Sequence, residues 1–156
     1  MASLRRDVVA IVTGGSFASG RRVALGLAGW GWAIVVVYLE QQRTVEATVV
    51  EILAAGGRVV AVRADLADDL DVQRLFVESQ AAFGGVDVVV HTMTSSAPLL
   101  CRYAARHVRE GGVVVTASAD TPADPGVARR LHERGITVGT VRPHELLAFL
   151  DRWRRR

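Results

Sequence analysis

The sequence predicts an α/β fold in which a doubly wound, parallel sheet of six strands carries helices on both faces. Short runs of β-branched residues alternate with segments of helical periodicity from one end of the chain to the other. The strand-like runs are also almost wholly apolar, which is typical of parallel strands buried on both faces. No internal repeat, low-complexity tract or linker interrupts this alternation, so we expect one domain over residues 1–156.

The expected strands share a high content of valine and other residues that favour a pleated, buried surface. They are Val8–Thr13, Ala33–Tyr38, Arg58–Val62, Val86–His91, Val113–Ala117 and Thr137–Val141. Six strands joined by helices make a complete doubly wound sheet.

Helices are expected between these strands. Two segments carry apolar stripes at helical spacing, namely Val45, Val49, Ile52 and Leu53, and then Val72, Leu75, Phe76, Ser79 and Phe83. Further helices are expected at Gly20–Ala28, Leu99–Val108, Gly126–Arg134 and Glu145–Trp153. Glycine pairs at 56–57, 84–85 and 111–112 are expected to end helices, because glycine adopts the left-handed conformation of a C-terminal cap.

Length and composition limit the class of protein. The chain has 156 residues, of which 50% are hydrophobic, and is long enough to bury one core. Its apolar runs fall far short of the roughly 20 residues that cross a bilayer, so no membrane association is expected. The N-terminus lacks the features of a signal peptide, which favours the cytoplasm. Cys101 is the single cysteine and no metal-ligand cluster is visible, so neither a disulfide nor a metal site is expected.

The basic balance comes from arginine alone. The formal net charge is +3, and all 19 cationic side chains are arginine because the sequence contains no lysine. The arginine-rich segment 152–156 would suit an acidic partner or nucleic acid. No aromatic interleaving or helix-turn-helix pattern supports nucleic-acid binding, so we interpret this segment as a solvated helix end that complements the helix dipole.

A glycine-rich loop, TGGSFASG at 13–20, lies between the first strand and the first helix. A helix N-terminus offers unpaired N–H groups and a positive dipole end, and glycine lets the backbone approach a ligand closely. The loop therefore predicts a phosphate site in a Rossmann-type fold.

With its surroundings, this loop resembles that of the short-chain dehydrogenase/reductase family, which reads TGxxxGxG. Four later stretches match the family in order and spacing: RADL at 63–66, the segment 71–92, GGVVVTAS at 111–118 and RGITVGTVRP at 134–143. The resemblance covers nearly the whole chain and implies the family's dinucleotide-binding fold.

The resemblance also implies roles within the loop. Gly14 and Gly20 would serve the tight turn and the helix start, while Ala18 stands where the family usually has its middle glycine. Ser16 either donates to phosphate or caps the turn. Asp65, with Leu66, stands where the family places the Asp that contacts the adenine ring.

The end of the second strand bears on the choice between NAD(H) and NADP(H). An acidic residue there would bind a free ribose 2′-hydroxyl, whereas an arginine would bind a 2′-phosphate. Arg43, Arg21 and Arg22 are within plausible reach, and Glu40 argues the other way. We therefore expect NADP(H) or NAD(H), with a leaning to NADP(H).

The catalytic pair of the family is absent. Its members use a Tyr and a Lys four residues later, together with a Ser and usually an Asn, and the Lys lowers the pKa of the Tyr. The two tyrosines here, Tyr38 and Tyr103, fall on the second strand and on the helix before the fifth strand. Ala119 occupies the catalytic Ser position and 91–94 replaces the family's NNAG motif. The resemblance thus implies that the adenine half is kept, and that ordinary hydride transfer by Tyr and Lys is not possible.

Three classes of function remain open. The first is an auxiliary or repurposed, non-redox dinucleotide-binding protein, in secondary metabolism, which acts through a protein partner or as a homo-oligomer. The second is an oxidoreductase, lyase, cyclase or isomerase with a rebuilt site at the carboxyl ends of the strands, where open α/β sheets bind ligands. The candidate residues for such a site are His91, Ser118, Arg142 and His144. The third is a decayed fragment, against which the undisturbed core pattern argues. We favour the first.

Overall fold

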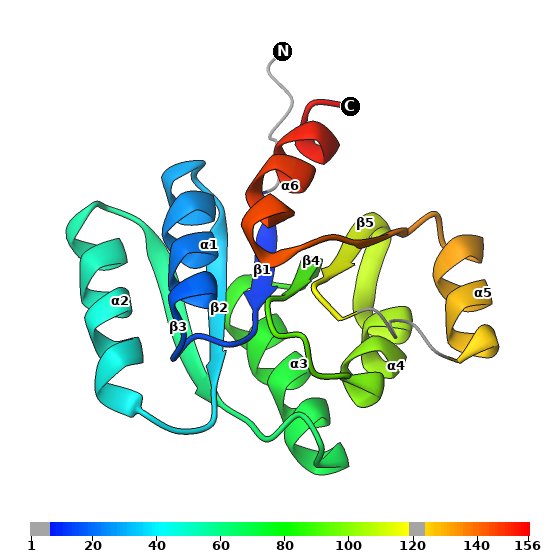
Figure 1. Ribbon diagram of the computed structural model, residues 1–156, viewed down its shortest axis with the longest axis horizontal. Coiled ribbons are helices and arrows are strands. Elements are labelled where there is room, and N and C mark those ends of the chain that lie inside the picture. The colour runs from blue at the N-terminus through cyan, green and yellow to red at the C-terminus, as the bar shows by residue number, and fades with distance from the viewer. Residues whose placement is uncertain (1–6, 119–123) are drawn as a thin grey trace.

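The computed structural model describes residues 7–118 and 124–156 (Figure 1), so Ala119 and the first six residues lie outside the described part of the chain. The strands are β1 (Val9–Val12), β2 (Ala33–Tyr38), β3 (Arg58–Arg63), β4 (Val86–His91), β5 (Val108–Thr116) and β6 (Thr137–Thr140). They form one six-stranded sheet in the order β3-β2-β1-β4-β5-β6, and neighbouring strands pair in parallel. The predicted fold class is confirmed.

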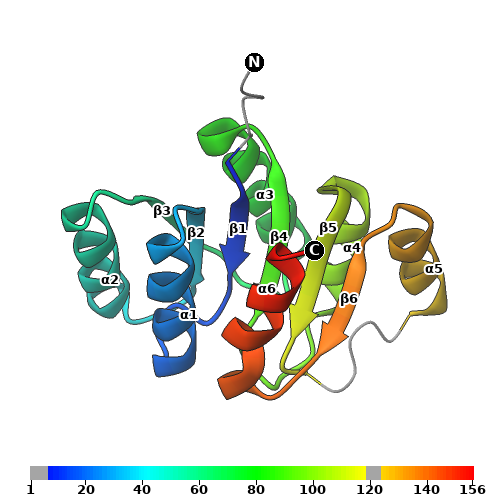
Figure 2. The same cartoon turned by 90° about the horizontal axis from the view of Figure 1, so that it is seen from above.

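Helices connect the strands and cover both faces of the sheet. They are α1 (Ala18–Gly29), α2 (Gln42–Ala54), α3 (Asp69–Phe83), α4 (Pro98–His107), α5 (Pro125–Glu133) and α6 (Leu146–Arg154), with a short 3₁₀ turn at Pro143–Glu145. Figure 2 shows α6 beside α1 on one face, with α3 and α4 behind the strands on the other. Within the described residues, no helix combines the length and the apolar character that a membrane span needs.

Two apolar cores lie on the two faces of the sheet. Alternate residues of β1 point to opposite faces, so Val9 and Ile11 join one core and Ala10 and Val12 join the other. The first core packs against α3, α4 and α5, and the second against α1, α2 and α6. Burial on both faces explains why the central strands β1, β2 and β4 are almost continuously apolar, whereas the edge strands β3 and β6 are only partly buried.

The strand order places a topological switch point between β1 and β4. β1 pairs with β2 on one side and with β4 on the other, and the connections from these two central strands run to opposite halves of the sheet. In such sheets the carboxyl ends at the switch point form the crevice where ligands bind. The fold therefore positions the loops after β1 and β4 for a site.

One expected helix end is wrong. Gly84 caps α3 in the left-handed conformation and Gly56 follows α2 with φ +81°, as predicted. The pair Gly111 and Gly112 instead lies inside β5, which starts immediately after α4. The pairing of β4 with β5 shifts register there, and a Cβ on Gly112 would lie 2.3 Å from the carbonyl oxygen of Asp87. These glycines serve a strand irregularity rather than a helix cap.

The apolar stripe of α2 is narrower than expected. Val45 and Ile52 are buried and Val49 is partly buried, but the side chain of Leu53 is exposed. Thr48 is buried in its place, on the side of α2 that faces Arg21 of α1. The stripe of α3 is confirmed.

Two leucines of α3 test this packing. Leu75 is fully buried, whereas Leu70 is 74% exposed on the same helix. We expect Leu75→Ala to lower the free energy of unfolding by about 2–5 kcal/mol, because it leaves a cavity in the core. Leu70→Ala is the matched control and should change it by less than about 0.5 kcal/mol. Urea unfolding followed by circular dichroism measures both, and equal losses would contradict the described orientation of α3.

Candidate functional site

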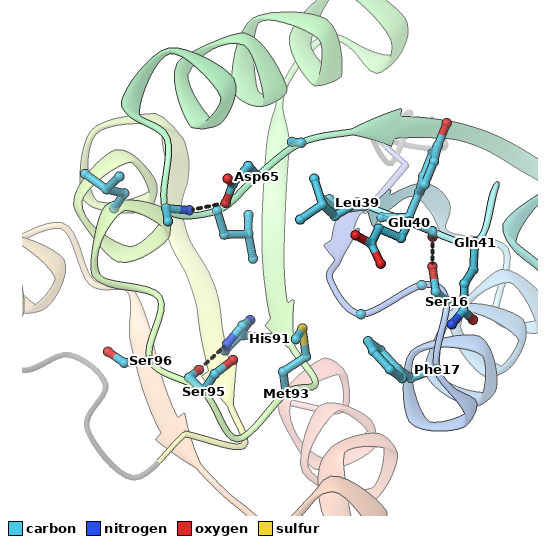
Figure 3. A pocket seen from close by; sticks show the side chains of 18 of the residues that line it. Ser16, Phe17, Leu39, Glu40, Gln41, Asp65, His91, Met93, Ser95 and Ser96 are labelled. Carbon is cyan, nitrogen blue, oxygen red and sulfur yellow. Dashed lines mark hydrogen bonds between the residues drawn. The ribbon is translucent and has the colours of Figure 1, made fainter.

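A cavity of about 520 Å³ opens at the carboxyl ends of β1, β2, β3 and β4 (Figure 3). Four segments line it: the glycine loop at 14–17, the end of β2 at 37–41, the loop after β3 at 64–67, and six residues between 91 and 99 from the end of β4 to the start of α4. The cavity therefore lies at the switch point, where the fold predicts a ligand site.

The glycine loop is shaped by contacts within the protein. Gly14 has φ +67°, and a Cβ there would lie 2.4 Å from Oγ1 of Thr92. A Cβ on Gly20 would lie 2.1 Å from the carbonyl oxygen of Gly14, and one on Gly15 would lie 2.3 Å from Cγ1 of Val36. The tight turn and close helix start expected of Gly14 and Gly20 are present, and a side chain at any of these glycines would disturb the packing of the loop itself.

The N-terminus of α1 faces the loop and carries no negative charge. The helix begins at the exposed Ala18, its N-cap Phe17 makes no side-chain capping bond, and its first turn contains no acidic residue. The first N–H groups of a helix have no partner within the helix, so they attract an anion. Ser16 donates a 2.5 Å hydrogen bond to the carbonyl oxygen of Glu40, which joins the loop to the end of β2.

Two carboxylates hold the loop after β3, that of Asp65 in the loop and that of Asp71 in α3. The backbone N–H of Asp65 donates to Asp71 at 2.8 Å, and this bond holds the pKa of the Asp71 carboxyl below its usual value. The Asp65 carboxylate accepts from the N–H of Ala67 at 2.9 Å. Asp65 and Leu66 both line the cavity, and Figure 3 shows Asp65 across the cavity from Ser16 of the glycine loop.

None of the three expected arginines lines the cavity. Arg21 donates to the carboxylate of Glu51 and to the hydroxyl of Thr48, which places its guanidinium between α1 and α2. Arg43 is exposed in the first turn of α2, and Arg22 lines a separate cavity. Glu40 does line the main cavity.

His91 is buried at the floor of the cavity, and both ring nitrogens are bonded. Nε2 lies 2.7 Å from the carbonyl oxygen of Ser95, which only accepts, so Nε2 carries the proton. Nδ1 therefore accepts from the hydroxyl of Thr13 at 2.7 Å. That hydroxyl accepts in turn from the N–H of Thr92, whose own hydroxyl donates to the carbonyl of Thr13. In this structure neither nitrogen of His91 is offered to a ligand.

Burial lowers the pKa of His91 below its ordinary value of 6.5, although the bond to Ser95 opposes this shift. The loss of hydration free energy on burying the charged imidazolium is larger than the stabilisation that the bond to Ser95 gives it. His91 is accordingly neutral at pH 7.

The four candidate residues for a rebuilt catalytic site do not come together. His91 lines the main cavity, but Ser118 does not, and its carbonyl accepts from the hydroxyl of Thr116 at 3.0 Å. Arg142 is exposed and donates to Glu145 at 2.8 Å. His144 lines a separate cavity of about 220 Å³ near the start of α1. The shared site expected of these residues is not present in this structure.

Other reactive side chains are also engaged elsewhere. The hydroxyl of Tyr103 donates to Asp69 of α3, and this bond raises the pKa of the phenol. Burial raises the pKa of the Cys101 thiol to about 12, which keeps it protonated. Tyr38 lines the cavity from β2. Within residues 7–118 and 124–156, no three His, Cys, Asp or Glu side chains are grouped as a metal site would need.

The sequence pointed to the end of β4 through His91 and the stretch 91–94, but it did not indicate the start of α4 as part of the site. Met93, Pro98 and Leu99 line the cavity, yet none carries a chemical signal in the sequence. Met93 lies in the stretch that stands at the family's NNAG position, whereas Pro98 and Leu99 are indicated by their place after the strand at the switch point, which requires the strand order. Phe17 was visible as a large apolar residue in a polar loop, and it is 55% exposed at the cavity rim.

A family model described as short chain dehydrogenase matches residues 8–111, well over half of the chain. The chain belongs to the short-chain dehydrogenase family. The match includes every residue that lines the main cavity, and Ser118, Arg142 and His144 lie beyond it.

Curated relatives from a fungus and a cyanobacterium show the same likeness. The short chain dehydrogenase claC of Passalora fulva is 31% identical over 144 residues, which cover 78% of this chain and 54% of that protein. A 3-oxoacyl-[acyl-carrier-protein] reductase of Synechocystis is 39% identical over 83 residues, which cover 53% of this chain and 34% of that protein. The chain thus spans about half the length of the first relative and a third of the second.

Solved structures of the family share the fold. A dehydrogenase/reductase from Sinorhizobium meliloti 1021 has a TM-score of 0.73 and 26% identity, with 94% of this chain and 86% of that chain covered. A short chain dehydrogenase from Burkholderia cenocepacia, solved in complex with NADP, has a TM-score of 0.69 and 28% identity, with 90% of this chain and 75% of that chain covered.

The burial of His91 predicts a pH-dependent stability. The unfolded chain protonates this imidazole near 6.5, and the folded chain does so only at lower pH. Stability should therefore fall as the pH drops below 6.5, until the folded pKa is reached. His107, whose pKa is also lowered by burial, adds to the same trend. His91→Asn should flatten this slope, and should lower the free energy of unfolding by about 2–4 kcal/mol at pH 7.5 because it removes buried hydrogen bonds.

Thermal melts between pH 5 and pH 8 measure both effects. His132→Asn, on the exposed side of α5, is the matched control. A His91→Asn protein with the melting temperature and pH slope of the wild type would contradict the described network.

Proposed function

We propose that this protein binds a nicotinamide adenine dinucleotide in the main cavity and serves an auxiliary or repurposed, non-redox role. The observation that carries the proposal is the open cavity of about 520 Å³ between the glycine loop and the ends of β2 and β3. Its position at the switch point and its mixed apolar and polar lining fit a nucleotide. The NADP complex of the Burkholderia relative supports the assignment.

The pyrophosphate would lie on the glycine loop, at the N-terminus of α1. Ala18 begins the helix, and no acidic residue in the first turn would repel a phosphate. The N–H groups of this turn and the dipole of the helix supply the attraction. The hydroxyl of Ser16 is close by and would exchange its bond to Glu40 for one to phosphate.

The adenosine would lie at the opposite end of the cavity. Ala64, Leu66 and Leu99 give the cavity an apolar lining that suits a purine ring. Asp65 lies beside them, where its carboxylate and the backbone after β3 would contact the ring edge.

We further propose that a free ribose 2′-hydroxyl is preferred, which favours NAD(H) over the NADP(H) to which the sequence leans. Glu40 follows the last glycine of the loop, Gly20, by about 20 residues, the spacing at which an acidic residue binds this hydroxyl. It lines the cavity, whereas Arg21 is held by Glu51. A 2′-phosphate would meet the carboxylate of Glu40 without a lining arginine among the described residues.

The non-redox part of the proposal rests on the absent Tyr–Lys pair. The sequence contains no lysine, and Tyr103 is bonded to Asp69 outside the cavity. Tyr38 lines the cavity, but the sequence offers no lysine to act beside it as the family mechanism requires. Proton transfer by the family mechanism would therefore fail, and binding itself would be the function.

The variant Ala18→Glu tests the phosphate site without disturbing the fold. A glutamate at the first position of α1 stabilises the helix through its dipole but repels a bound pyrophosphate. We expect at least a tenfold loss of NAD affinity in calorimetric titration, with an unchanged or higher melting temperature. Ala18→Gln is the neutral control of the same size and should bind as the wild type does. Equal affinities of all three proteins would refute a phosphate at this helix.

The preference for the ribose hydroxyl is tested at Glu40. Wild-type protein should bind NAD more tightly than NADP, and Glu40→Arg should shift the ratio toward NADP by at least tenfold, because it replaces repulsion of the 2′-phosphate with attraction. Glu46→Arg makes the same charge change on the exposed side of α2, outside the cavity. If Glu46→Arg shifts the ratio of NAD to NADP affinity equally, the effect is one of overall charge, and Glu40 does not bind the ribose 2′-hydroxyl.

A further inference from the structure

We infer that the cavity recognises the adenosine diphosphate part of its ligand alone, so that ADP and ADP-ribose bind as tightly as the complete dinucleotide. This inference rests on the proposed nucleotide site and names the chemical class that it reads. The supporting observation is which strands supply the residues that line the cavity.

A doubly wound sheet consists of two mononucleotide-binding halves, here β1–β3 and β4–β6. The cavity is lined by the ends of β1, β2 and β3 and by the segment that follows β4. Among residues 7–118 and 124–156, no lining residue follows β5 or β6. Of the residues that the structure describes, those of the first half make most of the lining, and the second half contributes the end of β4 and the segment that follows it.

The segment after β4 packs against the glycine loop at this side of the cavity. The bond from His91 to the carbonyl of Ser95 draws the segment back over the end of its own strand. The side chain of Met93 packs on the start of the glycine loop, where a Cβ on Gly14 would lie 3.1 Å from its Cγ. Figure 3 shows Met93 between His91 and Phe17.

Three polar side chains of the second half, Arg142, His144 and Ser118, do not line the main cavity. Arg142 is exposed and paired with Glu145, and His144 lines a different cavity with Arg22. Ser118 is buried and does not line the main cavity. A nicotinamide ring leaving the diphosphate would thus remain in water, where it adds no affinity.

Such a site binds the adenine nucleotide, and its affinity does not depend on the redox state of the nicotinamide. The free N–H groups of α1 suit a diphosphate, and the apolar end near Leu66 suits the purine. ADP supplies both groups, and ADP-ribose and NAD supply them equally. The site then has no need of a proton relay, in agreement with the absence of lysine.

The experiment is calorimetric titration of the full chain with ADP, ADP-ribose, NAD, NADH and nicotinamide mononucleotide. We expect the dissociation constants of ADP, ADP-ribose, NAD and NADH to agree within about threefold, and nicotinamide mononucleotide to show no binding. The fluorescence of NADH should stay as in water at saturation, because the dihydronicotinamide remains solvated. Ala18→Glu should weaken ADP, ADP-ribose and NAD by the same factor if all three place the diphosphate on α1.

Two results overturn the inference and leave the proposed function standing. One is NAD binding more than about tenfold tighter than ADP-ribose, and the other is enhanced NADH fluorescence on binding, since either shows that the nicotinamide is held. Binding of nicotinamide mononucleotide alone also overturns it, because that places a site in the second half. Absence of binding by every nucleotide refutes the proposed function together with the inference.

Discussion

The architecture of the site depends on a buried hydrogen-bond network that ties the carboxyl ends of β1 and β4 together. Thr13 ends one strand and His91 the other, and Thr92 bonds back to Thr13 through both its backbone and its hydroxyl. Gly14 follows at once, with no room for a side chain against Thr92. Because each of these polar groups is buried and satisfied, the network strongly favours one arrangement of the two loops. The glycine loop, the start of α1 and the floor of the cavity all take their positions from it.

This constraint divides the sheet into two halves with different properties. The central strands of both halves are buried, because Val113, Val114 and Val115 of β5 lie in the cores as the residues of β1 do, whereas the edge strand β6 is only partly buried. A cavity of about 520 Å³ opens at the strand ends of the first half, and Pro143 and His144 after β6 line a separate one of about 220 Å³. Core packing stabilises a fold whether or not a ligand binds, whereas an open cavity stabilises nothing by itself. The apolar cores are therefore what this chain needs to fold, and the main cavity is what it offers to a ligand.

The sequence predicted the fold and the glycine loop because both rest on local patterns. Continuous apolar runs identify buried parallel strands, and the loop motif fixes its own turn. The misses all depend on contacts between distant segments. Gly111 and Gly112 look like a helix cap until the register shift between β4 and β5 is known, and Leu53 looks buried until the side of α2 that faces α1 is known.

The same reason explains the misread site residues. Arg21 looked available to a phosphate because its partners Thr48 and Glu51 are about 30 residues away and belong to the next helix. His91 had the chemistry of a general base, and its two hydrogen bonds to Thr13 and Ser95 are invisible in the sequence. Side-chain chemistry could be read directly, but whether a side chain is already bonded requires the tertiary contacts.

The glycines of the loop carry less functional weight than their motif suggests. Added Cβ atoms at Gly14, Gly15 and Gly20 would strike Thr92, Val36 and the loop backbone, so the fold alone requires all three. A relic that bound nothing would keep them for that reason. Packing of the core does not require the cavity, and it does not require the exposed ring of Phe17 at the cavity rim. Filling the cavity or replacing Phe17 would leave the core packing unchanged. The case for a ligand therefore rests on the open space between the loop and the ends of β2 and β3.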